Sequence, residues 1–97
     1  MKIFNKDYLE EFVKKHADSK TALNRWIQVI EEANWKTHGE LKQLFPTADY
    51  VGNSRYIFNI RGNNYRLVVA IVFIAGVVTI RFIGTHADYD KIDCSTI

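Results

Sequence analysis

The chain has little cysteine and little proline, and these scarcities already exclude several classes of protein. Cys94 is the only cysteine among 97 residues, which excludes a disulfide scaffold and a zinc site built on cysteines. Pro46 is the only proline, and it marks the change from a mostly helical pattern to a strand-like one. No repeat, low-complexity segment or linker divides the sequence, so we expect one domain over residues 1–97.

Long apolar runs are also missing. The longest, LVVAIVFIAGVVTI at residues 67–80, has 14 residues, whereas a membrane-spanning helix needs about 20. It is rich in Val and Ile and contains Ala75-Gly76, a pattern typical of two buried strands joined by a tight turn. Residues 1–10 are too polar for a signal peptide, so we expect a cytoplasmic protein without membrane contact.

Metal-binding and nucleotide-binding motifs are absent as well. The three histidines lack metal-ligand spacing such as HExxH, and no phosphate loop, GxGxxG or GxSxG motif occurs. We therefore expect neither a metal nor a cofactor. The composition, 47% hydrophobic and 13% aromatic with a net charge of +2, supports a buried core and excludes intrinsic disorder.

Helical periodicity characterises the first half of the chain. We expect a short strand at residues 1–4 and then a helix with Asn5 as its N-cap. Asp18 or Ser19 caps a second helix with a broad apolar stripe, and residues 35–45 predict a loop with a short helical turn.

Strand-like patterns characterise the second half. Three strands are predicted, at residues 55–60, 64–74 and 77–83. A short last helix follows, capped by Thr85 with Asp88 at its third position. Helices followed by strands indicate an α+β fold in which the apolar sheet face packs against the helices.

Acidic side chains are missing from residues 50–87, where four arginines and no lysine occur. Arginine makes bidentate, permanently charged contacts with phosphate. Two-residue turns at Gly62-Asn63 and Ala75-Gly76 would place the polar residues of the three strands on one sheet face. These residues are Arg55, Asn59, Arg61, Asn64, Arg66, Thr79 and Arg81.

The same register places the apolar residues, Phe82 among them, on the opposite face against the helices. Ala70 then lies between Arg55 and Arg81, which leaves a notch that suits a phosphodiester. An alternative is that the arginines only keep an exposed sheet face in solution. Such a face normally carries both signs of charge, which weighs against that alternative.

Residues 85–91 follow the third strand directly. His86, Tyr89 and Asp90 share one face of a helical turn at spacings i, i+3 and i+4, and all three are proton-transfer residue types. The alternative is a capping turn with a solvated histidine. His16 is predicted at the C-terminus of the first helix, and His38 lies in a loop without an assigned role.

Three segments carry a family resemblance: LFPTAD at residues 44–49, YIFNIRGNNYRLV at 56–68 and THADYD at 85–90. In this order they resemble the HigB toxins of type II toxin–antitoxin systems, members of the RelE-like superfamily. The resemblance covers nearly the whole chain. It implies a single RelE-like toxin domain whose N-terminal helices pack on one face of a small, mainly antiparallel sheet, with a short C-terminal helix.

The resemblance also implies an activity and partners. Such toxins are mRNA interferases, which cleave mRNA in the ribosomal A site without a metal. The RNA 2′-hydroxyl attacks the adjacent phosphate and leaves a 2′,3′-cyclic phosphate and a 5′-hydroxyl end. The implied partner is a HigA-type antitoxin with a helix-turn-helix domain, through which the complex binds operator DNA.

Phosphoryl transfer of this kind needs cations for the transition state, a base and an acid. The candidate catalytic residues are Arg66, Arg81, His86, Tyr89 and Asp90, and the candidate RNA-binding residues are Arg55, Arg61 and Lys91. This chain lacks the lysine pair that RelE carries on its sheet, which leaves the general base open. Two alternatives remain: a non-catalytic RNA-binding module, or a decayed toxin that acts only as the partner of a helix-turn-helix protein.

Overall fold

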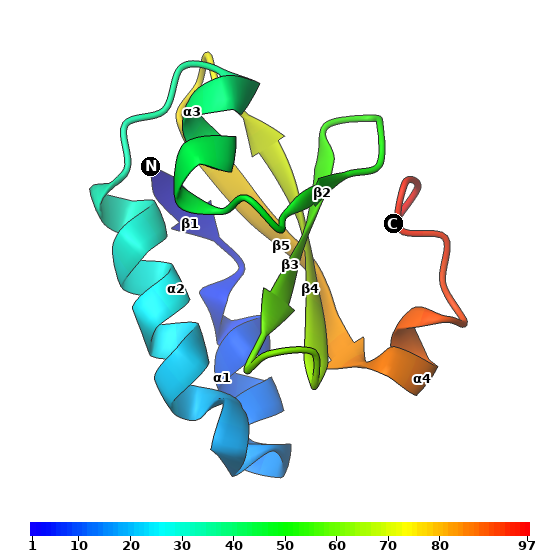
Figure 1. The fold of residues 1–97 in the computed structure, drawn as a ribbon. Coiled ribbons are helices and arrows are strands. Elements are labelled where there is room, and N and C mark those ends of the chain that lie inside the picture. Colours follow the sequence, from blue (N-terminus) through cyan, green and yellow to red (C-terminus); the bar gives the residue numbers. More distant parts are fainter.

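A five-stranded sheet forms the centre of the computed structural model, which describes residues 1–97 (Figure 1). The strands are β1 (Lys2–Phe4), β2 (Asp49–Tyr50), β3 (Arg55–Ile60), β4 (Tyr65–Val72) and β5 (Val77–Thr85). Their spatial order is β1-β5-β4-β3-β2, and only β1 and β5 are parallel neighbours. The expected mainly antiparallel sheet is confirmed, and the short β2 is an addition.

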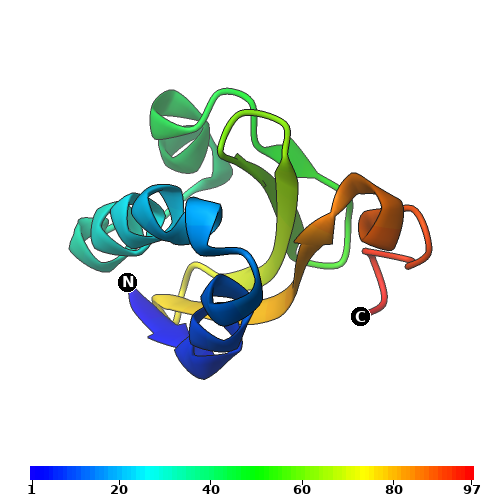
Figure 2. The ribbon, with the colours of Figure 1, turned by 90° about the horizontal axis from the view of Figure 1, so that it is seen from below.

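Three helices cover one face of this sheet: α1 (Lys6–Lys15), α2 (Lys20–Glu32) and α3 (His38–Leu44). A 3₁₀ turn, η1 (Ala17–Ser19), joins α1 to α2. The short α4 (His86–Tyr89) and the segment after it lie on the other side of the sheet (Figure 2). The expected α+β architecture is therefore confirmed. None of the helices is both long and apolar enough to cross a membrane.

The main core lies between these three helices and the sheet. Leu9, Trp26 and Ile30 come from α1 and α2, and they belong to one buried cluster with Phe58 and Leu67 of the sheet. Burial of this apolar surface is the main favourable contribution to folding. It determines which sheet face meets the helices and which stays available for a site.

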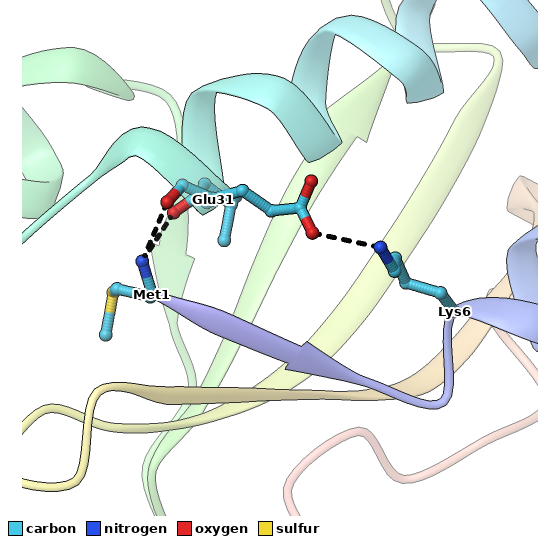
Figure 3. A network of polar contacts seen from close by, with 4 residues as sticks. Met1, Lys6 and Glu31 are labelled. Carbon is cyan, nitrogen blue, oxygen red and sulfur yellow. Dashed lines mark hydrogen bonds and ion pairs between the residues drawn. The ribbon is translucent and has the colours of Figure 1, made fainter.

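Polar contacts hold β1 beside the end of α2 (Figure 3). The Met1 amino group donates to the carbonyl oxygens of Ile30, Glu31 and Ala33 at 3.0, 3.2 and 2.7 Å. A positive charge is favourable there because the last carbonyls of a helix carry partial negative charge. Lys6 Nζ pairs with Glu31 Oε2 at 2.9 Å, which ties the start of α1 to α2.

The predicted register of the first hairpin is confirmed. Asn59 pairs with Arg66, and Arg55 pairs with Ala70. Arg61, however, does not lie on the arginine-bearing side as expected. Its φ of 52° and that of Gly62, 63°, end the strand alternation, and Arg61 Nη1 bonds Asp18 Oδ2 at 2.9 Å on the helix side.

The second hairpin differs from the prediction in the position of its turn. The turn was expected at Ala75-Gly76 with Ile74 opposite Val77, but Val72 lies opposite Val77 and Gly76 N donates to the Phe73 backbone oxygen at 3.1 Å. Ala70 therefore pairs with Thr79 and not with Arg81. The shift is by two positions, so at this point of the sheet the assignment of residues to faces is unchanged.

A β-bulge in β5 then changes that assignment. Val69 pairs with Ile80 and Val68 pairs with Phe82, which leaves Arg81 as the extra residue. After the bulge, the side chains of β5 alternate in the opposite sense. Phe82 therefore shares the face of its partner Val68, away from the helices, and Ile83 belongs to the core on the helix side. The prediction that Phe82 packs against the helices is wrong for this reason.

Candidate active site

The sheet face opposite α1, α2 and α3 carries three arginines, and we call it the arginine face. Arg55 begins β3, Arg66 is the second residue of β4, and Arg81 occupies the bulge of β5. None of them forms an ion pair with a carboxylate side chain; the three ion pairs of the structure involve Lys6, Lys14 and Arg61. Three cations without an acidic partner on one face suit an anionic ligand.

Arg55 and Arg81 meet above the intervening strand β4. Arg55 donates to the backbone oxygen of Ile97 from Nε at 3.1 Å and from Nη2 at 2.6 Å. Arg81 Nε donates to the same oxygen at 3.0 Å. The two arginines therefore converge, although the register around Ala70 differs from the prediction, and we call the point between their guanidinium groups the notch. Three N–H groups directed at one oxygen are the geometry that an oxyanion needs.

Arg66 is held differently, by an aromatic ring. Its guanidinium carbon lies 5.1 Å from the ring centroid of Tyr89, a cation–π contact between β4 and α4. The Nε of Arg66 is buried without a hydrogen-bond partner. A buried, unpaired donor is costly in a folded protein and is often a sign of a functional position.

Tyr89 is the second member of this pair, and its surroundings favour the protonated form of its hydroxyl. Burial, followed by the hydrogen bond with Cys94 Sγ at 3.5 Å, raises the pKa of Tyr89 to about 12. Arg66 acts in the opposite direction but is the weaker influence. At neutral pH Tyr89 is a phenol and not a phenolate. Tyr89 is therefore suited to donate a proton and not to accept one.

Asp49 is a neighbour of Tyr89 that sequence reasoning missed. Its pairing with Ile57 places Asp49 on the arginine face, and its charge contributes to the raised pKa of Tyr89. The signal was present, since Asp49 is the last acidic residue before the acid-free stretch and closes the LFPTAD segment. Without β2 in the prediction, nothing indicated on which face Asp49 lies.

The capping of α4 agrees with the prediction. Thr85 Oγ1 accepts from Asp88 N at 3.3 Å, and Asp88 Oδ2 accepts from Thr85 N at 3.3 Å. This reciprocal box holds α4 at the end of β5, with His86 and Tyr89 half-buried and Asp90 exposed at the C-cap. No side-chain hydrogen bond joins His86, Tyr89 and Asp90 to one another.

Gly84 allows α4 to lie close to the sheet. A Cβ at this position would lie 2.7 Å from Phe82 Cζ and 3.0 Å from Asp88 Cβ. Both distances are below ordinary carbon–carbon contact. The close approach brings the ring of Tyr89 within reach of Arg66.

Other predicted residues lie outside this group. Arg61 pairs with Asp18 on the helix side, and Lys91 is exposed beyond α4. His16 caps the end of α1 as expected and stacks on Phe12. His38 Nδ1 lies 2.7 Å from the hydroxyl of Tyr56, on the side of α3.

Comparison with known proteins identifies the family. The family model of the HigB toxin, described as the RelE-like toxic component of a toxin–antitoxin system, matches residues 19–92. The mRNA interferase HigB of Escherichia coli O6:H1 is 32% identical over 94 residues, which are 95% of this chain and 91% of that protein. The mRNA interferase toxin HigB of Escherichia coli K12 is 30% identical over 93 residues, which are 93% and 88% of the two chains. With its arginine face and capped α4, this chain belongs to the HigB toxin family of toxin–antitoxin systems.

Proposed function

We propose that this chain is the toxin of a type II toxin–antitoxin system and acts as a ribosome-dependent mRNA endoribonuclease. The observation that carries the proposal is the convergence of Arg55 and Arg81 on one oxygen, with Arg66 on the strand between them. Phosphodiester cleavage places negative charge on the phosphate oxygens, and such charge needs donors fixed in advance. The relatives named mRNA interferase HigB support the same activity.

In the proposed mechanism the arginines act on the phosphate. Arg81 and Arg55 hold one non-bridging oxygen, and we assign Arg66, further along β4, to stabilising the charge that develops as the 2′-oxygen attacks phosphorus. The bond from the 2′-oxygen to phosphorus forms, and the bond from phosphorus to the 5′-oxygen breaks. The products are a 2′,3′-cyclic phosphate and a 5′-hydroxyl end.

Two proton transfers accompany this exchange of bonds. One proton leaves the 2′-hydroxyl, and another reaches the departing 5′-oxygen. Tyr89 is a phenol at neutral pH, so we assign it to the donor side of the reaction. His86 and Asp90 remain the candidates for the base, with Asp90 either accepting the proton itself or orienting His86.

The substrate is presented by the ribosome in this proposal. The net charge of +2 is small for a protein that meets RNA alone, and two lysines of the helical side, Lys6 and Lys14, are already paired. Lys15, Lys20 and Lys91 are exposed and carry no ion pair, so they are available for ribosomal or messenger RNA backbone. Family membership implies an antitoxin, and we infer a HigA-type protein with a helix-turn-helix domain that carries the complex to operator DNA.

The proposal is tested by induced expression in a bacterial host with primer extension on a reporter mRNA. The test compares wild type with the site variants Arg81→Ala and His86→Ala. The control is Arg25→Ala, which removes an exposed arginine of α2, a helix on the opposite side of the sheet from the arginine face. We expect growth arrest and translation-dependent cuts from wild type and Arg25→Ala, and neither from the two site variants.

Three other results would contradict the proposal. Folded wild-type protein that causes no arrest and no cuts would favour a decayed toxin that only binds its antitoxin. Cuts that persist in both site variants would place the active site elsewhere on the molecule. RNA binding without any cleavage product would indicate a non-catalytic RNA-binding module.

A further inference from the structure

Residues 93–97 lie over the arginine face, on the side of the sheet opposite α1 and α2 (Figure 2). The Ile97 backbone oxygen takes all three N–H groups that Arg55 and Arg81 direct into the notch. Asn53 Nδ2 donates to the Ser95 oxygen at 2.9 Å, and Cys94 Sγ contacts the hydroxyl of Tyr89. Every anchor of this segment is therefore on or beside the proposed site.

A local turn directs the segment back onto the sheet. Asp93 Oδ1 accepts hydrogen bonds from Ser95 N at 3.1 Å and from Ser95 Oγ at 2.7 Å. Thr96 N donates to the backbone oxygen of Asp93 at 3.1 Å. The two bonds from Ser95 lower the pKa of Asp93, so the carboxylate that holds the turn is charged at neutral pH. Aspartate side chains commonly stabilise a backbone turn by accepting a hydrogen bond from the N–H group two residues further on.

The oxygen in the notch competes with an RNA phosphate for the same donors. An arginine N–H that bonds the Ile97 oxygen cannot at the same time make its best bond to a phosphate oxygen. A phosphodiester carries a full negative charge and makes charge-assisted, bidentate bonds with arginine. A phosphate can therefore displace the segment, but it must first overcome the contacts already made.

We propose that residues 93–97 are an autoinhibitory strap, which occupies the notch between Arg55 and Arg81 and must be displaced before RNA binds. This inference rests on the proposed function, because it describes the regulation of the same site. The strap lowers the apparent affinity for RNA by the fraction of time it is closed. If it is closed about nine-tenths of the time, removing it raises the affinity about ten-fold.

The first test compares RNA binding by three chains: wild type, a chain that stops after Ile92, and full-length Asp93→Ala. The probe is a short single-stranded RNA with 2′-O-methyl groups throughout, which cannot be cleaved, and binding is followed by fluorescence anisotropy. We expect about ten-fold tighter binding by the shortened chain and a smaller gain for Asp93→Ala. Circular dichroism verifies that each chain is folded.

The second test uses Cys94, the only thiol, as a reporter of the strap. Its labelling rate with N-ethylmaleimide, a neutral reagent, is measured without and with saturating probe RNA. We expect the RNA to accelerate labelling several-fold. Without RNA, Arg55→Gln should label faster than wild type because the notch loses two of its three bonds to Ile97, whereas Arg25→Gln should label at the wild-type rate.

The possible outcomes separate the strap from the site. If the RNA binds all three chains equally, or binds the shortened chain more weakly, the strap does not compete and the inference is overturned while the RNA site stands. Unchanged labelling of Cys94 at saturating RNA has the same meaning. If none of the chains binds the RNA, the strap does not compete with free RNA and the inference is overturned, whereas ribosome-dependent cleavage is judged by the primer-extension test above.

Discussion

The guanidinium group of Arg66 lies over the ring of Tyr89, with 5.1 Å from the guanidinium carbon to the ring centroid. The contact joins a strand to α4, the element with the candidate proton-transfer residues. A planar guanidinium stacks on an aromatic ring and presents several N–H groups, whereas the ammonium of lysine is a point charge. The position therefore needs arginine for geometry as well as for charge.

Replacement of Arg66 separates these two contributions. We expect Arg66→Gln to lower translation-dependent mRNA cleavage about 10²- to 10³-fold, the usual cost of removing one donor that stabilises a developing oxyanion. Arg66→Lys should recover only a small part of this loss, because it restores the charge without the stacking. Cleavage rates are measured by primer extension in a purified translation system. A rate for Arg66→Lys close to wild type would show that charge alone matters.

A second prediction concerns Gly84, which allows α4 to lie on the sheet. Gly84→Ala would place a Cβ 2.7 Å from Phe82 Cζ and 3.0 Å from Asp88 Cβ. Since Asp88 belongs to the cap of α4, we expect α4 to shift and the free energy of unfolding to fall by about 1–3 kcal/mol. Cleavage should fall as well, because His86 and Tyr89 move with α4.

The matched control is Gly39→Ala in α3. The nearest atom to a Cβ there is Thr37 Oγ1 at 3.9 Å, so the added methyl group meets no obstacle. Alanine is also the better helix former, and the free energy of unfolding should stay unchanged or rise by up to about 1 kcal/mol. Urea denaturation of both variants measures the difference. Equal effects of the two substitutions would mean that the contacts at Gly84 are relieved without movement of α4.

The first hairpin was predictable because two local signals agree on it. Gly62-Asn63 indicates a turn, and the alternation of residues 55–60 fixes which side chains face the helices. The pairing of Arg55 with Ala70 follows from these signals alone, and the structure confirms it. Arg61 departs from the pattern because its left-handed conformation depends on the turn geometry.

The second hairpin was less predictable because its features depend on tertiary pairing. The bulge at Arg81 is a mismatch between β5 and β4, and no turn residue or break in hydrophobicity marks it. Phe82 was therefore assigned to the wrong face. It was predictable that Arg55 and Arg81 share a face. The contacts that these arginines make with Ile97, and that Arg66 makes with Tyr89, were not predictable, because they depend on how far the side chains reach across the sheet.

Arg61 provides a third prediction, since the sequence made it a candidate RNA contact. Its guanidinium pairs with Asp18 on the helix side, where both side chains are about half exposed. We expect Arg61→Ala to leave cleavage within a few-fold of wild type, whereas Arg55→Ala loses most of it. Exposed pairs of this kind contribute little, so the free energy of unfolding should fall by at most about 1 kcal/mol. A loss of cleavage as large as that of Arg55→Ala would restore Arg61 to the RNA-binding surface.

The protonation of Tyr89 makes the stability of the fold depend on pH. Burial and the bond with Cys94 raise the pKa of Tyr89 from 10.0 to about 12 in the folded chain. Below pH 10 the phenol is protonated in both the folded and the unfolded chain, so the stabilising contribution is fully present. As the pH rises from about 10 to about 12, the unfolded chain loses the proton while the folded chain keeps it, and the free energy of unfolding falls.

Tyr89→Phe removes this titration and should therefore make the fall in stability above pH 10 less steep. Part of the fall remains in this variant, because burial raises the pKa of Tyr56 and the bond with Asp18 raises that of Tyr65. Denaturation curves between pH 8 and about 12 measure the slope, with Tyr8→Phe, a change at an exposed tyrosine of α1, as the control. Identical slopes for Tyr89→Phe and wild type would show that Tyr89 ionises equally in the folded and unfolded chains. The raised pKa of Tyr89 in the folded chain would then be contradicted.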